Sequence, residues 1–200
     1  MIAIIDYGMG NLRSVHKAME KLGFQVTVTS DANQVAGAEK VILPGVGAFA
    51  DAIKNLKRLG LDEAIHQVIR EGKPFLGICL GLQLLFTESE EDGRHQGLDI
   101  IRGRVTRLPP AVGKVPHMGW NQVEYRQQVP IFNDIPAGSY FYFVHSYYVV
   151  PDDERVTAAV SDYGLRFTCA IARGNLFATQ FHPEKSSSLG LRMLKSFGEL

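Results

Sequence analysis

Along the first half of the chain, short apolar runs typical of buried strands alternate with segments whose apolar residues recur at helical spacing. Residues 2–6 form a short apolar run that glycines end, which predicts a buried strand. Residues 12–22 carry apolar side chains at helical spacing, after Asn11 as a predicted N-cap and before Gly23 as a helix stop. Further strands are expected at 24–29, 41–43 and 75–78, and further helices at 48–59, 61–71 and 80–87. Strands that alternate with helices predict βαβ units and a parallel sheet.

The second half of the chain favours strands. Residues 88–115 are polar and broken by glycine and proline, so we expect a loop with short strands there. Strands are expected at 123–125, 140–150, 156–160, 168–172 and 176–181, with a Gly174-Asn175 hairpin turn and a final helix over about 188–197. The expected fold class is α/β, with a mostly parallel central sheet flanked by helices and an additional antiparallel sheet or hairpins in the C-terminal half. One domain over residues 1–200 suits this length.

Composition narrows the class of protein. The 200 residues are 46% hydrophobic and 21% charged, as in a soluble globular protein. Lys and Arg total 21 and Asp and Glu total 21, so the zero net charge gives no electrostatic basis for binding nucleic acid or an anionic membrane. No apolar run is long enough to span a membrane, and the N-terminus lacks the basic stretch of a signal peptide. We expect a cytoplasmic protein with reduced thiols, and neither a metal nor a cofactor.

Cys79 lies where a strand is expected to turn into a helix. Residues 77–81 have the sequence Gly-Ile-Cys-Leu-Gly, the thiol form of the nucleophile elbow, in which a sharp turn strains the nucleophile and glycines allow close packing. A helix N-terminus favours the reactive thiolate, and the Leu80 amide is placed to stabilise an oxyanion. Taken alone, the pattern is equally compatible with an ordinary buried cysteine. Cys169 lies within an expected hairpin strand and is interpreted as packing.

A thiol nucleophile needs a base and a group that orients the base. Among the six histidines, His182 lies at the end of an expected strand in the sequence His-Pro-Glu. Pro183 favours an extended His182, and residues two apart face the same way in an extended segment, so Glu184 can accept a hydrogen bond from the imidazole. Alone, this pair is compatible with a solvated strand end. Together with the elbow it predicts a Cys79-His182-Glu184 triad.

The whole chain resembles the class I glutamine amidotransferases. The resemblance is carried by Pro-Gly-Val-Gly at 44–47, the elbow followed by Gln83, His-Ser-Tyr at 145–147 and Gln-Phe-His-Pro-Glu at 180–184. It implies that Cys79 attacks the side-chain amide of glutamine to form a thioester, with His182 as general acid and base and Glu184 as its orienter. It further implies an oxyanion hole from the amides of Val46 and Leu80, and contacts to L-glutamine from Gly45, Gly47, Gln83, His145, Ser146 and Tyr147.

Three further segments, residues 6–12, 116–121 and 181–186, narrow the resemblance. They are similar to amidotransferase subunits of histidine biosynthesis, which implies a heterodimer with a separate (β/α)8-barrel cyclase that receives the ammonia. Free ammonia is protonated in neutral water, and a chain of this length has no room for an acceptor domain, so a docked partner is also expected on chemical grounds. The expected interface residues are Asn11, Met118, Trp120, Asn121, Tyr142 and Lys185.

Other interpretations stay open from the sequence. The chain is also compatible with another class I member, such as the glutaminase of pyridoxal phosphate synthesis, although residues 116–121 argue against it. A thiol peptidase on a similar sheet would turn over peptides without a partner. A non-catalytic binding module would not need to retain Cys79, His182 and Glu184. Trp120 has an alternative of its own, a place in the core.

Overall fold

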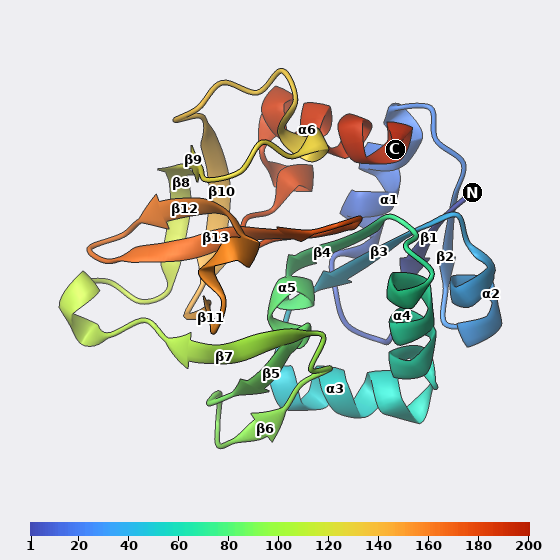
Figure 1. The fold of residues 1–200 in the computed structure, drawn as a ribbon, viewed down its shortest axis with the longest axis horizontal. Coiled ribbons are helices and arrows are strands. Elements are labelled where there is room, and N and C mark those ends of the chain that lie inside the picture. Colours follow the sequence, from blue (N-terminus) through green and yellow to red (C-terminus); the bar gives the residue numbers. More distant parts are fainter.

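A sheet of 12 strands forms the centre of the molecule in the computed structural model, which describes all 200 residues (Figure 1). Five neighbouring strands run parallel, in the order β2 (Val26–Thr29), β1 (Ile2–Ile5), β3 (Lys40–Gly45), β4 (Phe75–Cys79) and β14 (Leu176–Thr179). The chain therefore returns to the middle of the sheet near its C-terminus. This return places the residues that follow β14 beside the residues that follow β4.

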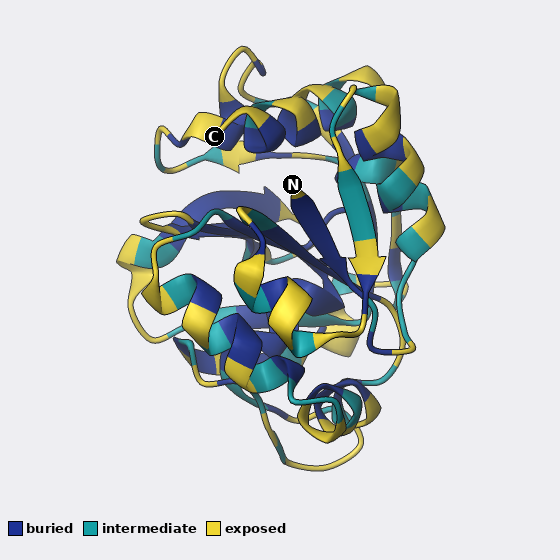
Figure 2. Ribbon diagram, turned by 90° about the vertical axis from the view of Figure 1, so that its right-hand side faces the viewer, coloured by how far each residue is buried: buried dark blue, intermediate teal, exposed yellow.

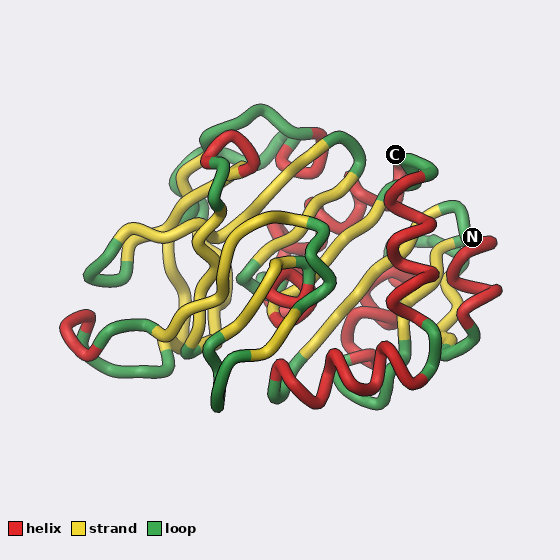
Figure 3. Tube along the Cα trace, turned by 60° about the horizontal axis from the view of Figure 1, so that its bottom comes forward, coloured by secondary structure: helices red, strands yellow, loops and turns green.

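The sheet continues beyond β14 as a mostly antiparallel half. The strands there are β13 (Arg166–Arg173), β11 (Tyr147–Pro151), β7 (Ile101–Arg107), β5 (Phe86–Ser89) and β6 (His95–Gln96), with β12 (Thr157–Asp162) and β9 (Glu124–Tyr125) attached to β13. A second sheet consists of the antiparallel pair β8 (His117–Gln122) and β10 (Tyr140–His145). Figure 3 shows this strand-rich half beside the half that carries most of the helices. The expected α/β class with antiparallel additions is confirmed.

Helices cover both faces of the parallel half. α1 (Leu12–Lys21) and α6 (Ser187–Glu199) pack together on one face, and α2 (Ala32–Gly37), α3 (Phe49–Arg58), α4 (Leu61–Arg70) and α5 (Leu80–Leu84) contribute to the core on the other. In α3 the buried residues Phe49, Ala52, Ile53 and Leu56 recur at helical spacing, whereas Asp51, Lys54, Lys57 and Arg58 are exposed. Figure 2 shows helices that are buried on one side and exposed on the other. Each face of the sheet thus has its own hydrophobic core. No helix combines the length and the apolar character needed to cross a membrane.

The predicted helix over 80–87 is wrong in its second half. α5 ends at Leu84 and β5 begins at Phe86. The amides of Leu98 and Asp99 donate to the carbonyls of Leu84 and Phe86, so a segment distant in sequence takes the place of the next helical turn. Gly97 permits this approach, because a Cβ there would lie 2.1 Å from the Phe86 carbonyl oxygen. Non-local pairing overrides helical spacing at this point.

The predicted strand over 140–150 is two strands. β10 and β11 are separated at Ser146, and β10 leaves the main sheet to pair with β8, which the sequence pattern did not predict. α2 was also not predicted, although Asp31 caps it by accepting from the amides of Asn33 and Gln34. β3 was predicted to end before Pro44 but extends to Gly45. Pro44 lies past the last residue paired with β1, where a missing amide is tolerated.

The remaining predicted boundaries hold to within a few residues. Gly174 adopts φ +59° in the hairpin turn between β13 and β14, as expected. Gly23 adopts φ +87° directly after the C-cap of α1. Asn11 occupies the N-cap position, but its side chain makes no capping hydrogen bond and only its carbonyl accepts, from the amides of Ser14 and Val15. The predicted side-chain cap is therefore wrong.

Candidate active site

Cys79 forms the junction between β4 and α5. Its backbone angles, φ +56° and ψ −108°, lie in a region that residues other than glycine rarely adopt. Glycines on both sides make the turn possible, because a Cβ on Gly81 would lie 1.9 Å from the Leu43 carbonyl oxygen and one on Gly77 would lie 2.9 Å from the Gly81 carbonyl oxygen. The thiol is free, as is that of the fully buried Cys169. The elbow geometry exposes one edge of an otherwise buried cysteine to the pocket.

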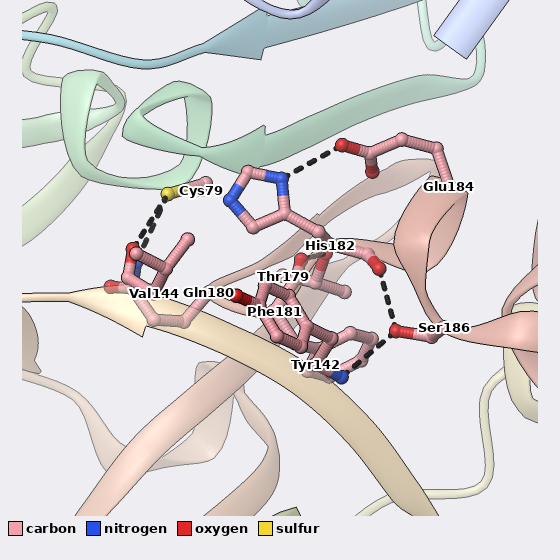
Figure 4. Close-up of polar contacts among 9 residues, drawn as sticks. All are labelled: Cys79, Tyr142, Val144, Thr179, Gln180, Phe181, His182, Glu184 and Ser186. Atoms are coloured by element: carbon pink, nitrogen blue, oxygen red, sulfur yellow. Dashed lines mark hydrogen bonds and ion pairs between the residues drawn. The ribbon is translucent and has the colours of Figure 1, made fainter. Parts of the chain in front are cut away.

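His182 and Glu184 form a buried pair behind the sulfur. His182 Nδ1 lies 2.8 Å from Glu184 Oε1, and the two side chains are only 2% and 1% exposed. Figure 4 shows the imidazole between this carboxylate and Cys79, with its other nitrogen on the side of the sulfur. His182 itself is extended, as predicted, with φ −100° and ψ 97°. Pro183–Lys185 then form a 3₁₀ turn, and this turn, in place of a continued extended segment, brings the pair together.

The environment of His182 determines its charge. Burial by itself lowers the pKa, but the proximity of Cys79 and the hydrogen bond and charge of Glu184 outweigh it and raise the pKa to about 10. The imidazole is therefore held protonated at neutral pH when its partners are ionised. A charged imidazolium beside the sulfur favours the thiolate and carries a proton for a leaving group.

A pocket of about 320 Å³ opens at Cys79. It brings together predicted residues from three separate segments, with Glu91, Pro116 and Val144 completing the lining. The predicted residues are Val46, Gly47, Cys79, Leu80, Gln83, His145, Ser146 and Tyr147. Gly45 is predicted for the site but does not line the pocket. It packs beneath, where a Cβ would lie 2.5 Å from the Tyr7 hydroxyl. His182 also stands behind the lining, not in it.

Side-chain amides connect the sulfur to the pocket wall. Gln180 Nε2 donates to Cys79 Sγ at 3.7 Å, and Gln180 Oε1 accepts from Gln83 Nε2 at 3.2 Å. Gln83 Nε2 also donates to the Tyr147 carbonyl at 3.1 Å. Both hydrogen bonds of the Gln83 side-chain nitrogen are therefore made within the protein.

No group of three or more His, Cys, Asp or Glu side chains is arranged to hold a metal ion.

Comparison with known proteins identifies the family of this chain. The family model described as glutamine amidotransferase class-I matches residues 3–199. The chain belongs to the class-I glutamine amidotransferase family. This match decides in favour of the family that the sequence resembles, over the peptidase and the binding module.

Relatives of this amidotransferase match along its whole length. The imidazole glycerol phosphate synthase subunit HisH of Moorella thermoacetica is 59% identical over 199 residues, which cover 100% of this chain and 94% of that protein. The subunit of the same name from Syntrophotalea carbinolica is 58% identical and covers 100% of both chains. A solved glutamine amidotransferase structure, at 19% identity, has a TM-score of 0.78 over 100% of this chain and 98% of its own. The PurLQS structure from Thermotoga maritima has the same TM-score at 17% identity, over 98% and 96% of the two chains. The two structures support the fold alone.

The predicted interface residues of the amidotransferase lie on one connected surface. Met118 and Trp120 on β8 are 61% and 53% exposed, so the alternative that Trp120 belongs to the core is wrong. The Trp120 ring meets Tyr142 of β10 edge to face, with centroids 6.1 Å apart. β10 contacts the turn that carries the exposed Lys185, and α1, which Asn11 precedes, contacts the same turn. Asn121 differs from the others, because its side-chain nitrogen is bonded within the protein, to the Asp162 carbonyl at 2.7 Å.

Strand β10 is also hydrogen-bonded to the segment of the catalytic candidate His182. The His182 amide donates to the Tyr142 carbonyl at 2.9 Å. The Tyr142 amide donates to Ser186 Oγ at 3.0 Å, and that hydroxyl donates to the His182 carbonyl at 2.6 Å (Figure 4). Both backbone groups of one strand residue therefore fix the position of the histidine.

Three residues of this site were not singled out from the sequence. Glu91 is the one acidic residue that lines the pocket, Gln180 bonds the sulfur, and the Tyr7 hydroxyl donates to the Pro44 carbonyl at 3.0 Å. Glu91 follows three other polar residues, and nothing in the local pattern separates it from them. For Gln180, the only available sign was its place in the motif that precedes His182.

Proposed function

We propose that this amidotransferase is the glutaminase subunit of imidazole glycerol phosphate synthase. It hydrolyses L-glutamine and passes ammonia to a cyclase subunit in histidine biosynthesis. The observation that carries the proposal is the pocket that opens on Cys79, with the buried His182–Glu184 pair behind the sulfur. The full-length similarity to subunits of that name supports the choice of pathway.

In the first half of the reaction, the Cys79 thiolate attacks the side-chain carbonyl carbon of glutamine. The negative charge that develops on the oxygen is stabilised by the amides of Leu80 and Val46, two residues that line the pocket. The imidazolium of His182 gives its proton to the amide nitrogen, the carbon–nitrogen bond breaks, and ammonia leaves a thioester on the sulfur. Glu184 holds the imidazole oriented throughout.

In the second half, His182 takes a proton from water, and the hydroxide attacks the thioester carbonyl. The carbon–sulfur bond breaks, the thiolate returns, and glutamate leaves. Glutamine carries an ammonium and a carboxylate at its other end. We assign Glu91 to the ammonium, because it is the acidic side chain in the pocket, and the backbone of residues 145–147 to the remaining contacts. Burial raises the pKa of Glu91, a cost that a bound cation offsets.

The partner is a separate (β/α)8-barrel cyclase that docks over β8, β10 and the turn at Lys185. Met118, Trp120 and Tyr140 give this face a large exposed apolar area, which is typical of an interaction site. Val144 of β10 lines the pocket, and its carbonyl lies 3.9 Å from the sulfur. Ammonia released at Cys79 therefore starts directly behind the docking strand. One domain over residues 1–200 and a cytoplasmic location, in keeping with two free thiols, complete the proposal.

A matched pair of cysteine variants tests the nucleophile. Ammonia release from glutamine is measured with the cyclase and its phosphoribulosyl-formimino nucleotide present. Cys79→Ala is expected to abolish it, whereas Cys169→Ala is expected to leave it within about twofold, because that sulfur lies in the core away from the pocket. Equal behaviour of the two variants would overturn the assignment.

The docking face is tested with Trp120→Ala, which is expected to lose capture of the cyclase. Unchanged capture would contradict the proposed docking face.

A further inference from the structure

Two buried histidines outside the proposed triad lie against each other beside the pocket. His117 on β8 is opposite His145 on β10, and His117 Nδ1 lies 2.9 Å from His145 Nε2. The His117 ring is stacked between Phe143 and Tyr163, with centroids 4.9 and 4.0 Å away. The stacking fixes the plane of the His117 ring, and neither imidazole side chain has a role in the steps proposed above, although the backbone of His145 is assigned to glutamine binding.

The Tyr147 carbonyl sets the direction of this contact. A carbonyl oxygen only accepts, so His145, whose Nδ1 lies 2.8 Å from it, carries its proton on Nδ1. A neutral His145 then has a bare Nε2, which accepts from the Nδ1–H of His117. His117 in turn has a bare Nε2, which accepts from the side-chain amide of Asn121 at 3.3 Å. Each proton position follows from the one before it.

The outer end of the chain gives the same orientation independently. The side-chain nitrogen of Asn121 donates to the Asp162 carbonyl at 2.7 Å. Its side-chain oxygen accepts from the amide of Gln122 at 2.8 Å. Asn121 must therefore present its nitrogen, a donor, to His117. The proton positions inferred from Asn121 and from Tyr147 agree.

The inner end of the chain reaches the sulfur of Cys79. The carbonyl of Tyr147 accepts both from His145 and from Gln83, Gln83 donates to Gln180, and Gln180 donates to Cys79 Sγ. Gln180 is fully buried, and Gln83 is 6% exposed where it lines the pocket. An uninterrupted series of hydrogen bonds thus joins the docking strand β8 to the sulfur.

Both rings are neutral at physiological pH. Burial lowers the pKa of His117 to about 4. Burial also lowers the pKa of His145 to about 3, where the neighbouring His117 and His182 add to the effect and the Tyr147 carbonyl opposes it. The only other titratable ring in contact with His117 is the stacked phenol of Tyr163.

We propose that His117 and His145 are positioning residues for glutamine hydrolysis. Both are neutral Nδ1–H tautomers, and Asn121 sets their orientation. Together they hold the Tyr147 carbonyl in place, and this carbonyl positions the sulfur of Cys79 through Gln83 and Gln180. The proposal rests on the assignment of Cys79 as nucleophile. It gives the strand that carries the docking residues a direct connection to the reacting atom.

Nitrogen-15 NMR of the imidazole rings in the full-length wild-type chain tests the tautomers directly at neutral pH. The resonances of the two rings are assigned from the signals lost in His117→Phe and in His145→Phe. Both rings are expected as Nδ1–H tautomers, although free histidine prefers the other form. An Nε2–H tautomer or a doubly protonated ring at either position would overturn the proposal.

Kinetics test the positioning role. His117→Phe keeps a stacked ring but removes both hydrogen bonds, and kcat for ammonia release is expected to fall about ten- to a hundredfold with little change in KM, because the sulfur is misplaced but the pocket is intact. His117→Asn places an amide donor where Nδ1 lies and is expected to recover kcat to within about threefold of wild type. His66→Asn on α4 is the matched control and should behave as wild type. A wild-type kcat in His117→Phe would refute the role.

The outcomes separate this proposal from the one on which it rests. Activity in Cys79→Ala would refute the nucleophile assignment itself. An inactive Cys79→Ala with a fully active His117→Phe would leave the nucleophile in place and refute only the positioning chain. Alkylation of Cys79 by iodoacetamide, followed by mass spectrometry, adds a readout that needs neither partner nor glutamine. The rate should differ from wild type in His117→Phe, and an identical rate would count against the chain.

Discussion

The neutral state of His117 makes the stability of the fold depend on pH in a specific window. In the unfolded chain the imidazole has its ordinary pKa of 6.5, whereas in the fold burial lowers the pKa to about 4. Between these values the unfolded chain binds one more proton than the folded chain, so stability falls as the pH falls. The contribution of His117 is fully present above pH 6.5 and is lost as the pH approaches 4.

The size of this effect follows from the proton count. Each buried neutral histidine costs about 1.4 kcal/mol of unfolding free energy per pH unit below 6.5. His145, with its pKa lowered to about 3, has the same sign, so the pair costs roughly 2.7 kcal/mol per unit. His182 has the opposite sign and a different window. Its pKa is raised to about 10, so its contribution is present below pH 6.5 and is lost as the pH rises toward 10.

Urea unfolding of wild type and His117→Phe, followed by far-ultraviolet circular dichroism between about pH 6.5 and 4.5, isolates the effect. The carboxylates titrate alike in both proteins, so they cancel in the difference. The unfolding free energy of wild type is expected to fall more steeply, by about 1.4 kcal/mol per pH unit. Parallel curves would mean that His117 is charged or solvated in the fold, and the reasoning would fail.

Three further substitutions examine the site. Gly81→Ala puts a Cβ 1.9 Å from the Leu43 carbonyl oxygen, so we expect a loss of about 3 kcal/mol or more by thermal denaturation, and a wild-type melting temperature would contradict the tight elbow. Tyr7→Phe leaves the buried Pro44 carbonyl without its donor and should cost about 1–3 kcal/mol in urea unfolding and slow ammonia release, since residues 44–47 lose an anchor. An unchanged rate would show that the anchor serves stability only. Glu184→Gln removes the charge that keeps the imidazole protonated, so kcat should fall about a hundredfold and the basic limb of the pH–rate profile should move to lower pH. A profile with the same limbs would argue against that role.

The parts of the fold that were predicted correctly are those whose information is local. Helix α3 has buried residues at helical spacing, and Gly174 adopts the left-handed backbone that its hairpin turn requires. Strand β8 was missed because its large apolar residues, Met118 and Trp120, lie on its exposed side, and the strand exists through pairing with β10. The end of α5 was misplaced because residues near Gly97 take over its carbonyls. Long-range pairing leaves little trace in a short window of sequence.

The same distinction applies to the site. Cys79 and the pair His182–Glu184 stand in short motifs at strand ends, and the two motifs together predicted the triad. The pairing of β14 with β4, which brings the motifs side by side, was not predicted. Glu91 and Gln180 are single polar residues whose positions become meaningful only when distant segments meet. The turn that joins His182 to Glu184 was mistaken for an extended segment, although the contact itself was predicted.

The bonds from Tyr142 to the segment of His182 limit how this protein can change its partner during evolution or by design. Side chains that point outward from β10 are free to vary, because the backbone makes the bonds. An insertion or deletion of one residue in the strand is different, since it would turn Phe141 and Phe143 toward solvent and bring another amide to Ser186. Point substitutions on the outer side of β10 can therefore change which partner binds, whereas a change in the length of the strand would disturb the site. A chimeric synthase should exchange surface side chains and keep the length of the strand.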